Sequence, residues 1–391
     1  MKILLTSDWY IPAVNGVVTS VCNLQRELTR RGHEVRLLTL APGVETRQQG
    51  GVTWLGSLDA GWIYPGARLR AGTGGQAIRE LIAWGPDVVH SQCEFSTFGP
   101  ACRIARACGA PLLHTYHTVY EDYTHYFFPF KGPGRALVRS LTRLVAGRTD
   151  GLIAPTPKVE ALLLGYGVRC PVEVVPTGID LERFARPADP GRTAALRARL
   201  GIPAGDRVLV FVGRLAREKN IEELLACRAA LGSGVTLLVV GGGPEEERLR
   251  AMAGPGVIFA GMADPAEVPD YYRLGDVFVS ASTSETQGLT YLEALASGLP
   301  ALCRADPCLE GVVTPGENGM LYQTPEELLR AARLLLADKT LRNRMAQAAA
   351  RSARKFTTRA FGQRMEALYR THVLAHRSAA GCHRRLLWQE I

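Results

Sequence analysis

One polar segment, residues 280–300, holds side chains that could bind a sugar and an anion. Its loop carries Glu285, Gly288 provides a turn, and the helix expected to follow carries Glu293. Carboxylates accept hydrogen bonds from paired sugar hydroxyls, and the backbone N–H groups at a helix start favour an anion. Thr290 and Glu293 also have the spacing of a capping box, which is a purely structural interpretation. Composition leaves both interpretations of Glu293 open.

A second polar loop, residues 213–220, follows the apolar run 207–212 and carries Arg214 and Lys219. Ligands of open α/β sheets bind beyond the carboxyl ends of the strands, where these two cations could clamp a diphosphate. A solvated loop in an arginine-rich chain is the competing interpretation. Taken by itself, the loop does not decide between them.

Two glycine turns precede expected helices, and we interpret them differently. At Asn15-Gly16 the glycine lets backbone N–H groups approach an anion at a helix start, although a plain turn and cap would have the same sequence. At residues 241–244, Gly-Gly-Gly-Pro is followed by three glutamates, whose charge satisfies the positive helix end and would repel a phosphate. We therefore predict a tight turn there, with Pro244 at the first helical position.

The composition is typical of a globular protein with two domains. Of the 391 residues, 47% are hydrophobic and 21% charged, close to the average for globular chains. No window has the roughly 18 uncharged apolar residues of a spanning helix, and the N-terminus lacks the apolar run of a signal peptide, so we expect a cytoplasmic protein. The nine cysteines form no C-x-x-C pair, which indicates reduced thiols and no metal site.

Short apolar runs alternate with helix-length stretches, a pattern typical of parallel sheets covered by helices. The expected strands are residues 2–6, 34–40, 87–90, 112–115, 151–154 and 172–175, and then 207–212, 236–240, 277–281 and 299–303. Between the two series the proline-rich stretch 186–191 is typical of a linker. We therefore predict an α/β protein with two similar halves, residues 1–183 and 184–357, and a helical C-terminal part.

The combination of these motifs resembles glycosyltransferase family 4, whose members are retaining enzymes that use nucleotide sugars and have the GT-B fold. The resemblance covers nearly the whole chain and rests on Asn15-Gly16, Gly213-Arg214, Lys219, Glu285 with Glu293, and Asn318-Gly319. More narrowly, residues 115–123, 284–290 and 308–312 resemble the bacterial diacylglycerol glucosyltransferases. The resemblance implies two Rossmann-like domains facing a cleft, a helix at 358–375 that crosses back to the first domain, and a basic tail at 376–391.

The resemblance also implies a role for each candidate residue. The donor diphosphate is held by the backbone of Gly16 with Arg214 and Lys219, and the ribose by Glu293. The donor sugar is held by Glu285 and by the backbone of Gln287, Gly288 and Leu289. His117 lies against the donor sugar and the reacting bond, so the implied catalytic residues are His117, Arg214, Lys219 and Glu285. The chain departs from many relatives in having Asn15-Gly16 where they carry Gly-Gly.

The implied reaction is transfer of a hexose, glucose from UDP-glucose, to a hydroxyl of a membrane lipid such as diacylglycerol. The two cations and helix-end N–H groups would stabilise the leaving UDP, so no cofactor or metal is expected. By analogy with the family, we expect same-face attack rather than a covalent intermediate. A soluble or polysaccharide acceptor and a nucleotide-sugar epimerase are the alternatives. An inactive lipid-binding protein is disfavoured by the retained site residues, and a dinucleotide oxidoreductase by the lack of G-x-G-x-x-G after the first strand.

The net charge of +9 favours an anionic partner, for which we expect a nucleotide sugar and an anionic membrane rather than nucleic acid. Residues 134–148 have the pattern of an amphipathic basic helix, with apolar side chains roughly opposite its arginines. The proposed membrane-binding residues are Phe127, Phe128, Lys131, Arg135, Arg139 and Arg143. They predict peripheral docking on the inner face of the cell membrane. The alternative is that the apolar face packs on the sheet and the arginines lie in water.

Overall fold

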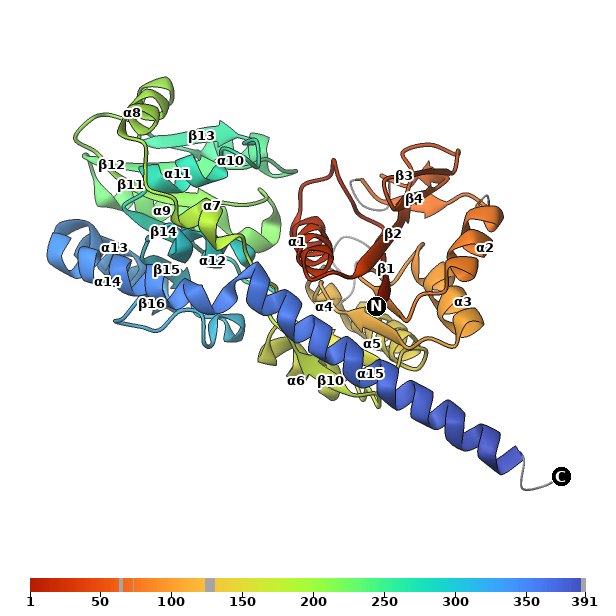
Figure 1. Cartoon of the computed structure of the whole chain (residues 1–391). Helices are drawn as coiled ribbons and strands as arrows, with labels where there is room; N and C mark the ends of the chain where they lie inside the picture. Colours follow the sequence, from red (N-terminus) through yellow and green to blue (C-terminus); the bar gives the residue numbers. More distant parts are fainter. Residues whose placement is uncertain (63–65, 73, 124–130, 388–391) are drawn as a thin grey trace. The chain divides into compact units, whose positions relative to one another are not determined.

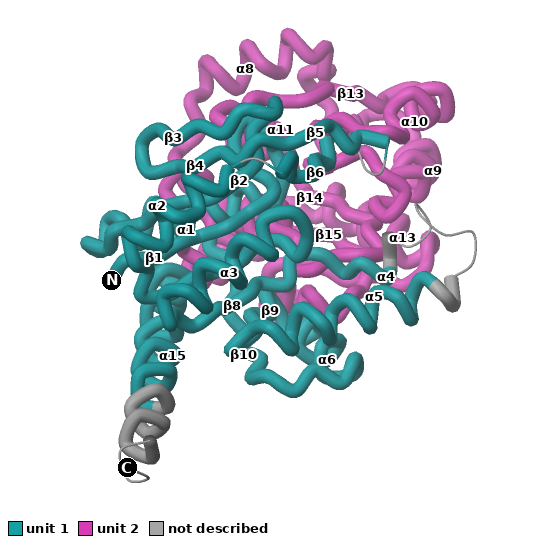
Figure 2. Tube along the Cα trace, turned by 90° about the vertical axis from the view of Figure 1, so that its right-hand side faces the viewer, with its two compact units in different colours: residues 1–178, 358–391 teal, residues 179–357 magenta. Residues whose placement is uncertain are grey.

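The computed structural model describes residues 1–62, 66–72, 74–123 and 131–387, with the side chains of 122–123, 131–133 and 379–387 left out. The chain divides into two compact units (Figure 2). Unit 1 comprises Met1–Gly178 and Thr358–Ile391, and unit 2 comprises Ile179–Thr357. Both units are α/β with parallel sheets, which confirms the predicted fold class.

The sheet of unit 1 has the strand order β10-β9-β8-β7-β1-β2-β4-β3 among the described residues, and only β3 is antiparallel to its neighbour. Its strands are β1 (Lys2–Thr6), β2 (Glu34–Leu40), β3 (Arg47–Gln49), β4 (Val52–Leu55), β7 (Val88–Ser91), β8 (Leu112–Thr115), β9 (Gly151–Ala154) and β10 (Val172–Val174). A separate hairpin is formed by β5 (Ser57–Asp59) and β6 (Arg68–Arg70). The strand order reverses between β1 and β7, so loops after these two strands diverge to opposite faces of the sheet and leave space at its carboxyl edge.

Helices cover both faces of this sheet (Figure 1). They are α1 (Gly16–Arg30), α2 (Gly75–Trp84), α3 (Phe98–Cys108), α4 (Tyr120–Tyr123), α5 (Lys131–Ala146), α6 (Pro157–Gly165) and α15 (Thr358–Leu387). Apolar side chains of α1 and α15 share one core with Ile3, Leu5 and Leu37, whereas α2 and α3 pack with Leu4 and Leu38. Alternate residues of the strands therefore serve opposite cores, as the period of a strand requires.

The C-terminal helix α15 belongs to unit 1, which confirms the predicted return to the first domain. Its buried side chains, Phe361, Met365, Tyr369 and Val373, recur at helical spacing and complete the core on the α1 side. The residues predicted to form a separate basic tail from 376 onward instead continue the helix as far as Leu387. Alanine and leucine in this stretch have high helix propensity, and the single Gly381 does not stop the helix.

The sheet of unit 2 has the order β13-β12-β11-β14-β15-β16 and is parallel throughout the described residues. Its strands are β11 (Arg207–Val212), β12 (Val235–Val240), β13 (Val257–Gly261), β14 (Val277–Ser280), β15 (Ala301–Arg304) and β16 (Gly319–Tyr322). This is the doubly wound order of a Rossmann-like domain, and its reversal lies between β11 and β14.

The helices of unit 2 again form two layers around the sheet. They are α7 (Leu181–Ala185), α8 (Pro190–Arg199), α9 (Ile221–Leu231), α10 (Glu246–Met252), α11 (Val268–Leu274), α12 (Leu289–Ala296), α13 (Pro325–Ala337) and α14 (Lys339–Ser352). Short 3₁₀ turns occur at η2 (Arg217–Lys219), η3 (Pro307–Leu309) and η4 (Ala353–Phe356).

The predicted linker at 186–191 lies inside unit 2, because the division between the units falls after Gly178 instead of after residue 183. Pro190 and Gly191 begin α8, and the side chain of Asp189 accepts hydrogen bonds from the N–H groups of Gly191 and Arg192. Proline is tolerated at the first helical position because its missing N–H would have no partner there. Proline and glycine here therefore mark a helix start.

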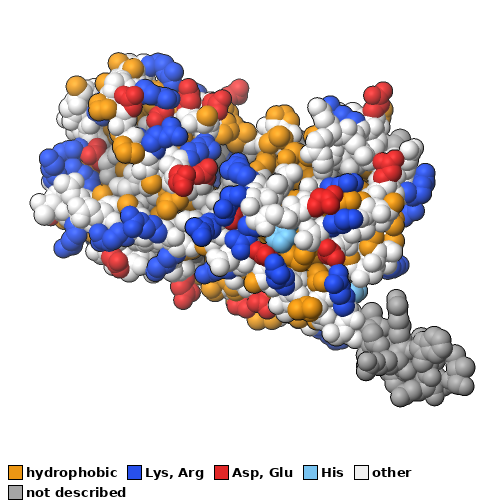
Figure 3. All heavy atoms as spheres, viewed as in Figure 1, with side chains coloured by type: hydrophobic (Ala, Val, Ile, Leu, Met, Phe, Trp, Pro, Cys, Tyr) orange, Lys and Arg blue, Asp and Glu red, His pale blue; other side chains and the backbone are white. Residues whose placement is uncertain are grey.

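The surface and the helices add two observations about partners. No described helix is both long enough and apolar enough to cross a bilayer. On the face drawn in Figure 3, Lys and Arg side chains are spread over both units with Asp and Glu among them. The positive charge on this face is therefore not gathered into one stripe.

Candidate functional site

The loops after β11 and β14 meet at the carboxyl edge of the unit 2 sheet, on either side of its strand-order reversal. The carbonyl oxygen of Glu218 accepts a hydrogen bond from the N–H of Thr283 at 2.9 Å, which joins the two loops through their backbones. Lys219 Nζ lies 2.5 Å from Glu285 Oε1, and the two side chains are only 17% and 13% exposed. The structure thus brings together two of the predicted site residues as a largely buried ion pair.

The loop that carries Arg214 packs closely against the glycine turn after β12. Leu215 N donates to Gly242 O at 3.0 Å, and Glu245 N donates to Leu215 O at 3.0 Å. A Cβ atom on Gly241 or Gly243 would collide with the carbonyl oxygens of the Arg214 loop, so only glycine permits this approach. The predicted tight turn at residues 241–244 is confirmed, but α10 begins at Glu246, so Pro244 precedes the helix.

Arg214 is partly buried in this loop. Burial lowers its pKa from the ordinary value, and the nearby Glu218 carboxylate opposes that shift. Arginine keeps its charge under such conditions, because its ordinary pKa lies far above physiological pH. The loop therefore carries two partly buried cations, Arg214 and Lys219.

Glu293 lies on α12, but it does not take part in a capping box. Gly288 has a left-handed backbone with φ of 69° and is the N-cap of α12, so Thr290 already lies within the helix. A Cβ on Gly288 would collide with the ring of Tyr291, which explains glycine at this turn. The Glu293 carboxylate instead accepts a hydrogen bond from the Tyr272 hydroxyl at 3.0 Å. The structural interpretation of Glu293 as a capping-box residue is therefore wrong.

Burial raises the pKa of Glu293 to about 7, while the hydrogen bond from Tyr272 lowers it. The folded protein therefore binds more protons than the unfolded chain between about pH 4.5 and 7, and the stability contributed by this group falls as pH rises through that range. Gln287 and Leu289, which flank Gly288, are buried and partly buried. Glu293 is thus a largely buried hydrogen-bond acceptor beside the strand-order reversal, and its charged form is costly even with the Tyr272 hydroxyl donating to it.

We expect Glu293→Gln to weaken UDP binding by about tenfold, the scale of lost hydrogen bonds to a charged acceptor, while raising stability above neutral pH. Removing the buried carboxylate should stabilise the variant by roughly 3 kcal/mol at about pH 8 and by less than about 1 kcal/mol at about pH 5. Calorimetry with UDP and thermal unfolding across this pH range measure both effects. Unchanged UDP affinity at about pH 8 would leave Glu293 with a structural role alone.

The remaining predicted donor contact, Gly16, lies in unit 1 at the start of α1. The Asn15 side chain caps this helix by accepting a hydrogen bond from Val18 N at 2.9 Å. Gly16 is exposed and is the first residue of the helix. The geometry is that of a helix cap, and it leaves the first-turn backbone of α1 at the carboxyl edge of β1.

His117 follows β8 at the carboxyl edge of the unit 1 sheet, next to polar residues that follow β7. Its Nε2 lies 2.7 Å from Gln92 Oε1. Burial lowers the pKa of His117 to about 4, with the Glu94 carboxylate acting in the opposite direction. The imidazole is therefore neutral at physiological pH.

Two further groups at this edge were not predicted from the sequence. The buried Glu94 accepts a hydrogen bond from the Tyr120 hydroxyl at 2.6 Å and lies 3.1 Å from His114 Nε2. Asp8 accepts hydrogen bonds from the N–H of Ser96 and from the N–H and hydroxyl of Thr97. Both carboxylates follow strands of the sheet, Asp8 after β1 and Glu94 after β7. Their position shortly after predicted strands was the sequence signal that could have identified them as candidate site residues.

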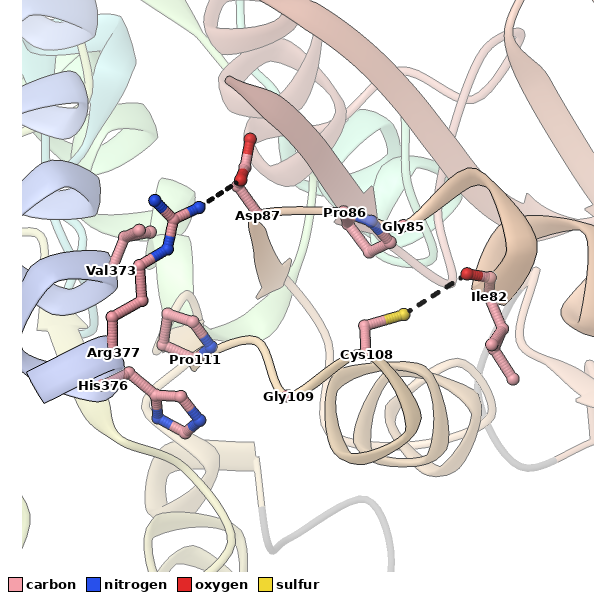
Figure 4. Close-up of a pocket in the computed structure, with 10 residues that line it drawn as sticks. All are labelled: Ile82, Gly85, Pro86, Asp87, Cys108, Gly109, Pro111, Val373, His376 and Arg377. Carbon is pink, nitrogen blue, oxygen red and sulfur yellow. Dashed lines mark hydrogen bonds and ion pairs between the residues drawn. The ribbon is translucent and has the colours of Figure 1, made fainter. Parts of the chain in front are cut away.

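A pocket of about 250 Å³ in unit 1 lies elsewhere (Figure 4). It is lined in part by Asp87 and Pro111, which precede β7 and β8, and by Arg377 of α15. Arg377 forms an ion pair with Asp87 at 2.8 Å. This cavity is at the amino ends of the strands, so it is on the opposite edge of the sheet from His117.

The predicted membrane segment is only partly described. Phe127 and Phe128 lie outside the described residues, as does the side chain of Lys131. Arg135 and Arg139 lie 3.7 and 3.3 Å from carboxylate oxygens of Glu121. Arg143 Nε donates to the carbonyl oxygen of Tyr166 at 2.5 Å. These three arginines of α5 therefore contact other residues of unit 1.

The apolar residues of α5 divide between the core and the surface. Thr142, Val145 and Ala146 are buried, whereas Leu137 and Leu144 are 55% and 49% exposed. The apolar arc predicted from the helical pattern is thus not uniformly buried. Leu137 and Leu144, one heptad apart, are half-exposed, so the alternative in which the apolar face packs on the sheet holds for only part of that face.

Comparison with known proteins agrees with this architecture. The sequence model of Glycosyltransferase Family 4 matches residues 14–183, and that of Glycosyl transferases group 1 matches residues 193–352. An alpha-monoglucosyldiacylglycerol synthase of Streptococcus pneumoniae is 36% identical over 85% of this chain and 77% of its own. An enzyme of the same name from Acholeplasma laidlawii is 29% identical over 94% and 96%. The crystal structure of Anabaena Alr3699/HepE with UDP-glucose has a TM-score of 0.73 at 18% identity, covering 95% and 100%.

Two Rossmann-like units, each with polar loops at the strand-order reversal, and a C-terminal helix returning to the first unit make up the GT-B fold. The chain belongs to glycosyltransferase family 4 and is a hexosyltransferase.

Proposed function

We propose that the protein is a retaining glucosyltransferase that moves glucose from UDP-glucose to a hydroxyl of a membrane lipid such as diacylglycerol. The observation that carries this proposal is the largely buried Lys219–Glu285 ion pair at the strand-order reversal of unit 2, with Arg214 on the loop after β11 and Glu293 on the helix after β14. Two relatives named as alpha-monoglucosyldiacylglycerol synthases support the choice of sugar and lipid.

In this proposal the site acts mainly through electrostatics. Cleavage of the glycosyl phosphate bond develops negative charge on UDP, which Arg214, Lys219 and the first-turn N–H groups of α1 at Gly16 stabilise. Glu293 accepts hydrogen bonds from the ribose hydroxyls. Glu285 and the backbone of Gln287, Gly288 and Leu289 hold the sugar. The acceptor hydroxyl attacks the face from which UDP leaves, with His117 against the sugar, and no metal is required.

A donor and acceptor panel tests this function. The protein is incubated with UDP- and GDP-sugars, in the presence of a chelator, with vesicles containing diacylglycerol or with soluble acceptors, and products are read by mass spectrometry. We expect glucosyldiacylglycerol from UDP-glucose, with the α-anomer identified by NMR. Transfer only to a soluble acceptor would refute the lipid assignment. Conversion of the nucleotide sugar without an acceptor would favour the epimerase.

A lipid acceptor requires the protein to reach a membrane surface, and α5 offers the means. Its outward Leu137 and Leu144 would enter the headgroup region, with Arg135, Arg139 and Arg143 beside anionic headgroups. Arg135 and Arg139 keep 57% and 51% of their side chains exposed despite their contact with Glu121. Docking is therefore proposed to be peripheral, on the inner face of the cell membrane.

We expect Leu137→Gln combined with Leu144→Gln to weaken binding to anionic vesicles by at least about tenfold, because two half-exposed leucines lose their transfer into lipid. Folding should be unaffected, since neither side chain fills the core. Vesicle co-sedimentation measures the effect. The matched control is Leu334→Gln with Leu374→Gln, two leucines that are 46% and 65% exposed on other helices. Equal binding by both double variants would exclude α5 from membrane docking.

A further inference from the structure

A chain of buried polar side chains runs from the C-terminal helix to His117, entirely within unit 1. The Tyr369 hydroxyl of α15 lies 2.7 Å from His90 Nδ1, and Thr115 Oγ1 lies 2.7 Å from His90 Nε2. The amide nitrogen of Gln92 is 3.0 Å from both ring nitrogens of His90. Gln92 Oε1 is 2.7 Å from His117 Nε2. Each link is short enough for a hydrogen bond.

These hydrogen-bonded side chains lie in the protein interior, where a polar group without a hydrogen-bond partner is costly. Tyr369 is fully buried, and His90 and Gln92 are 1% and 2% exposed. Burial holds the pKa of His90 well below its ordinary value and that of Tyr369 well above it, so the histidine is neutral and the tyrosine keeps its proton. Packing alone would be satisfied by phenylalanine at position 369, because the hydroxyl adds only a polar atom to an apolar helix face.

The protonation of His90 constrains the orientation of the Gln92 amide, which in turn constrains the tautomer of His117. A neutral His90 has one N–H and one lone pair. We assign the Tyr369 hydroxyl as the donor to Nδ1, which leaves the N–H at Nε2, where the Thr115 hydroxyl oxygen accepts it. The Gln92 amide nitrogen, 3.0 Å from both ring nitrogens, meets the electron-rich imidazole and shares the acceptor Nδ1 with Tyr369, an environment that attracts the amide NH₂ and repels the amide oxygen. The Gln92 oxygen therefore faces His117, which must carry its own proton at Nε2 to donate to it.

We infer that Tyr369 is a positioning residue for the transferase site: through His90 and Gln92 it fixes His117 in the tautomer protonated at Nε2, with the lone pair at Nδ1. Its importance for transfer rests on the role of His117 in the function proposed above. A histidine in this tautomer offers a sugar hydroxyl an acceptor at Nδ1, whereas the other tautomer would offer a donor. Tyr369→Phe frees Nδ1 of His90 to become the protonated nitrogen, after which the Gln92 amide can turn over.

The test is the tautomer of His117, read from long-range ¹H–¹⁵N spectra of protein labelled with ¹⁵N-histidine. His117→Asn identifies the signal of His117 by its loss. We expect a single Nε2-protonated form in the wild-type protein and a mixture of tautomers in Tyr369→Phe. Tyr166→Phe, which removes another buried tyrosine hydroxyl from unit 1, should leave the His117 signal unchanged. Gln92→Met breaks the chain at a different link and should give the same mixture, and it replaces Tyr369→Phe if that variant does not fold.

Activity gives the second readout. We expect Tyr369→Phe to lower kcat about tenfold, the scale of one lost hydrogen bond, with UDP affinity unchanged because the donor residues of unit 2 are untouched. An unaltered His117 tautomer in both Tyr369→Phe and Gln92→Met would overturn the inference, whatever their activity. A mixed tautomer with full transfer activity would keep the link but contradict the proposed role of His117. The two failures are therefore distinguishable.

Discussion

Lys219→Ala is expected to reduce transfer by at least about a hundredfold, the scale for loss of one preorganised electrostatic contact. UDP affinity should fall as well, because the ammonium group faces the diphosphate in the proposed mechanism. Glu285→Gln should reduce transfer to a similar extent and yet preserve or raise UDP affinity. Its carboxylate neutralises Lys219 in the unliganded protein, at a separation of 2.5 Å, and so competes with the diphosphate.

Both variants should fold, because the backbone hydrogen bond between Glu218 and Thr283 still joins the two loops. Circular dichroism checks the fold, steady-state kinetics the transfer, and calorimetry the UDP affinity. Arg217→Ala is the matched control, since Arg217 is an exposed cation in the same 3₁₀ turn and should keep activity within about twofold, the range of an exposed charge. A natively folded Lys219→Ala or Glu285→Gln variant with more than about half of wild-type activity would refute the assignment.

A chain that ends at Thr357 is expected to lose the folded state of unit 1. It lacks Phe361, Met365, Tyr369 and Val373, all of which are buried in the core shared with α1. Removing large core side chains costs about 2–5 kcal/mol each, so the sum is comparable with the roughly 5–15 kcal/mol that stabilises a whole domain. Transfer activity should disappear, while unit 2 keeps its own unfolding transition.

Thermal unfolding and hydrogen exchange measure this outcome unit by unit. The control is a chain that ends at Ser378, which retains the four core residues and Arg377 with its ion pair to Asp87. This control should unfold like the full chain. A soluble and fully active protein ending at Thr357 would show that α15 is dispensable for unit 1.

The sequence predicted those parts of the fold that depend on local pattern. Central strands such as β1 and β11 are continuous apolar runs, because they are buried on both faces, and they were placed to within a residue or so. Several edge and peripheral strands were missed: β13, for example, has a short apolar run but is only partly buried along its whole length, unlike the central strands. The loops that follow the central strands were also predicted, which is why Arg214, Lys219 and Glu285 could be proposed.

What local pattern could not supply is the identity of partners. The capping box at Thr290 failed because the left-handed backbone of Gly288 starts the helix two residues earlier than the motif assumes. Glu293 meets Tyr272 across the core, and His90 meets Tyr369 over a separation of 279 positions. Such pairs follow from the packing of elements that are remote in sequence. The resemblance to a family named the site residues without revealing these contacts.

The return of α15 to unit 1 also bears on the order in which the protein is completed at the ribosome. Residues 1–178 emerge first, but the core against α1 stays open until residues 361–373 have been synthesised. Unit 2 is one continuous stretch, so it can finish folding earlier, although it begins later. During that interval the nascent chain exposes an apolar face of unit 1, the kind of surface to which chaperones bind and through which unfinished chains aggregate. Activity that needs both units therefore appears only after synthesis of the last helix.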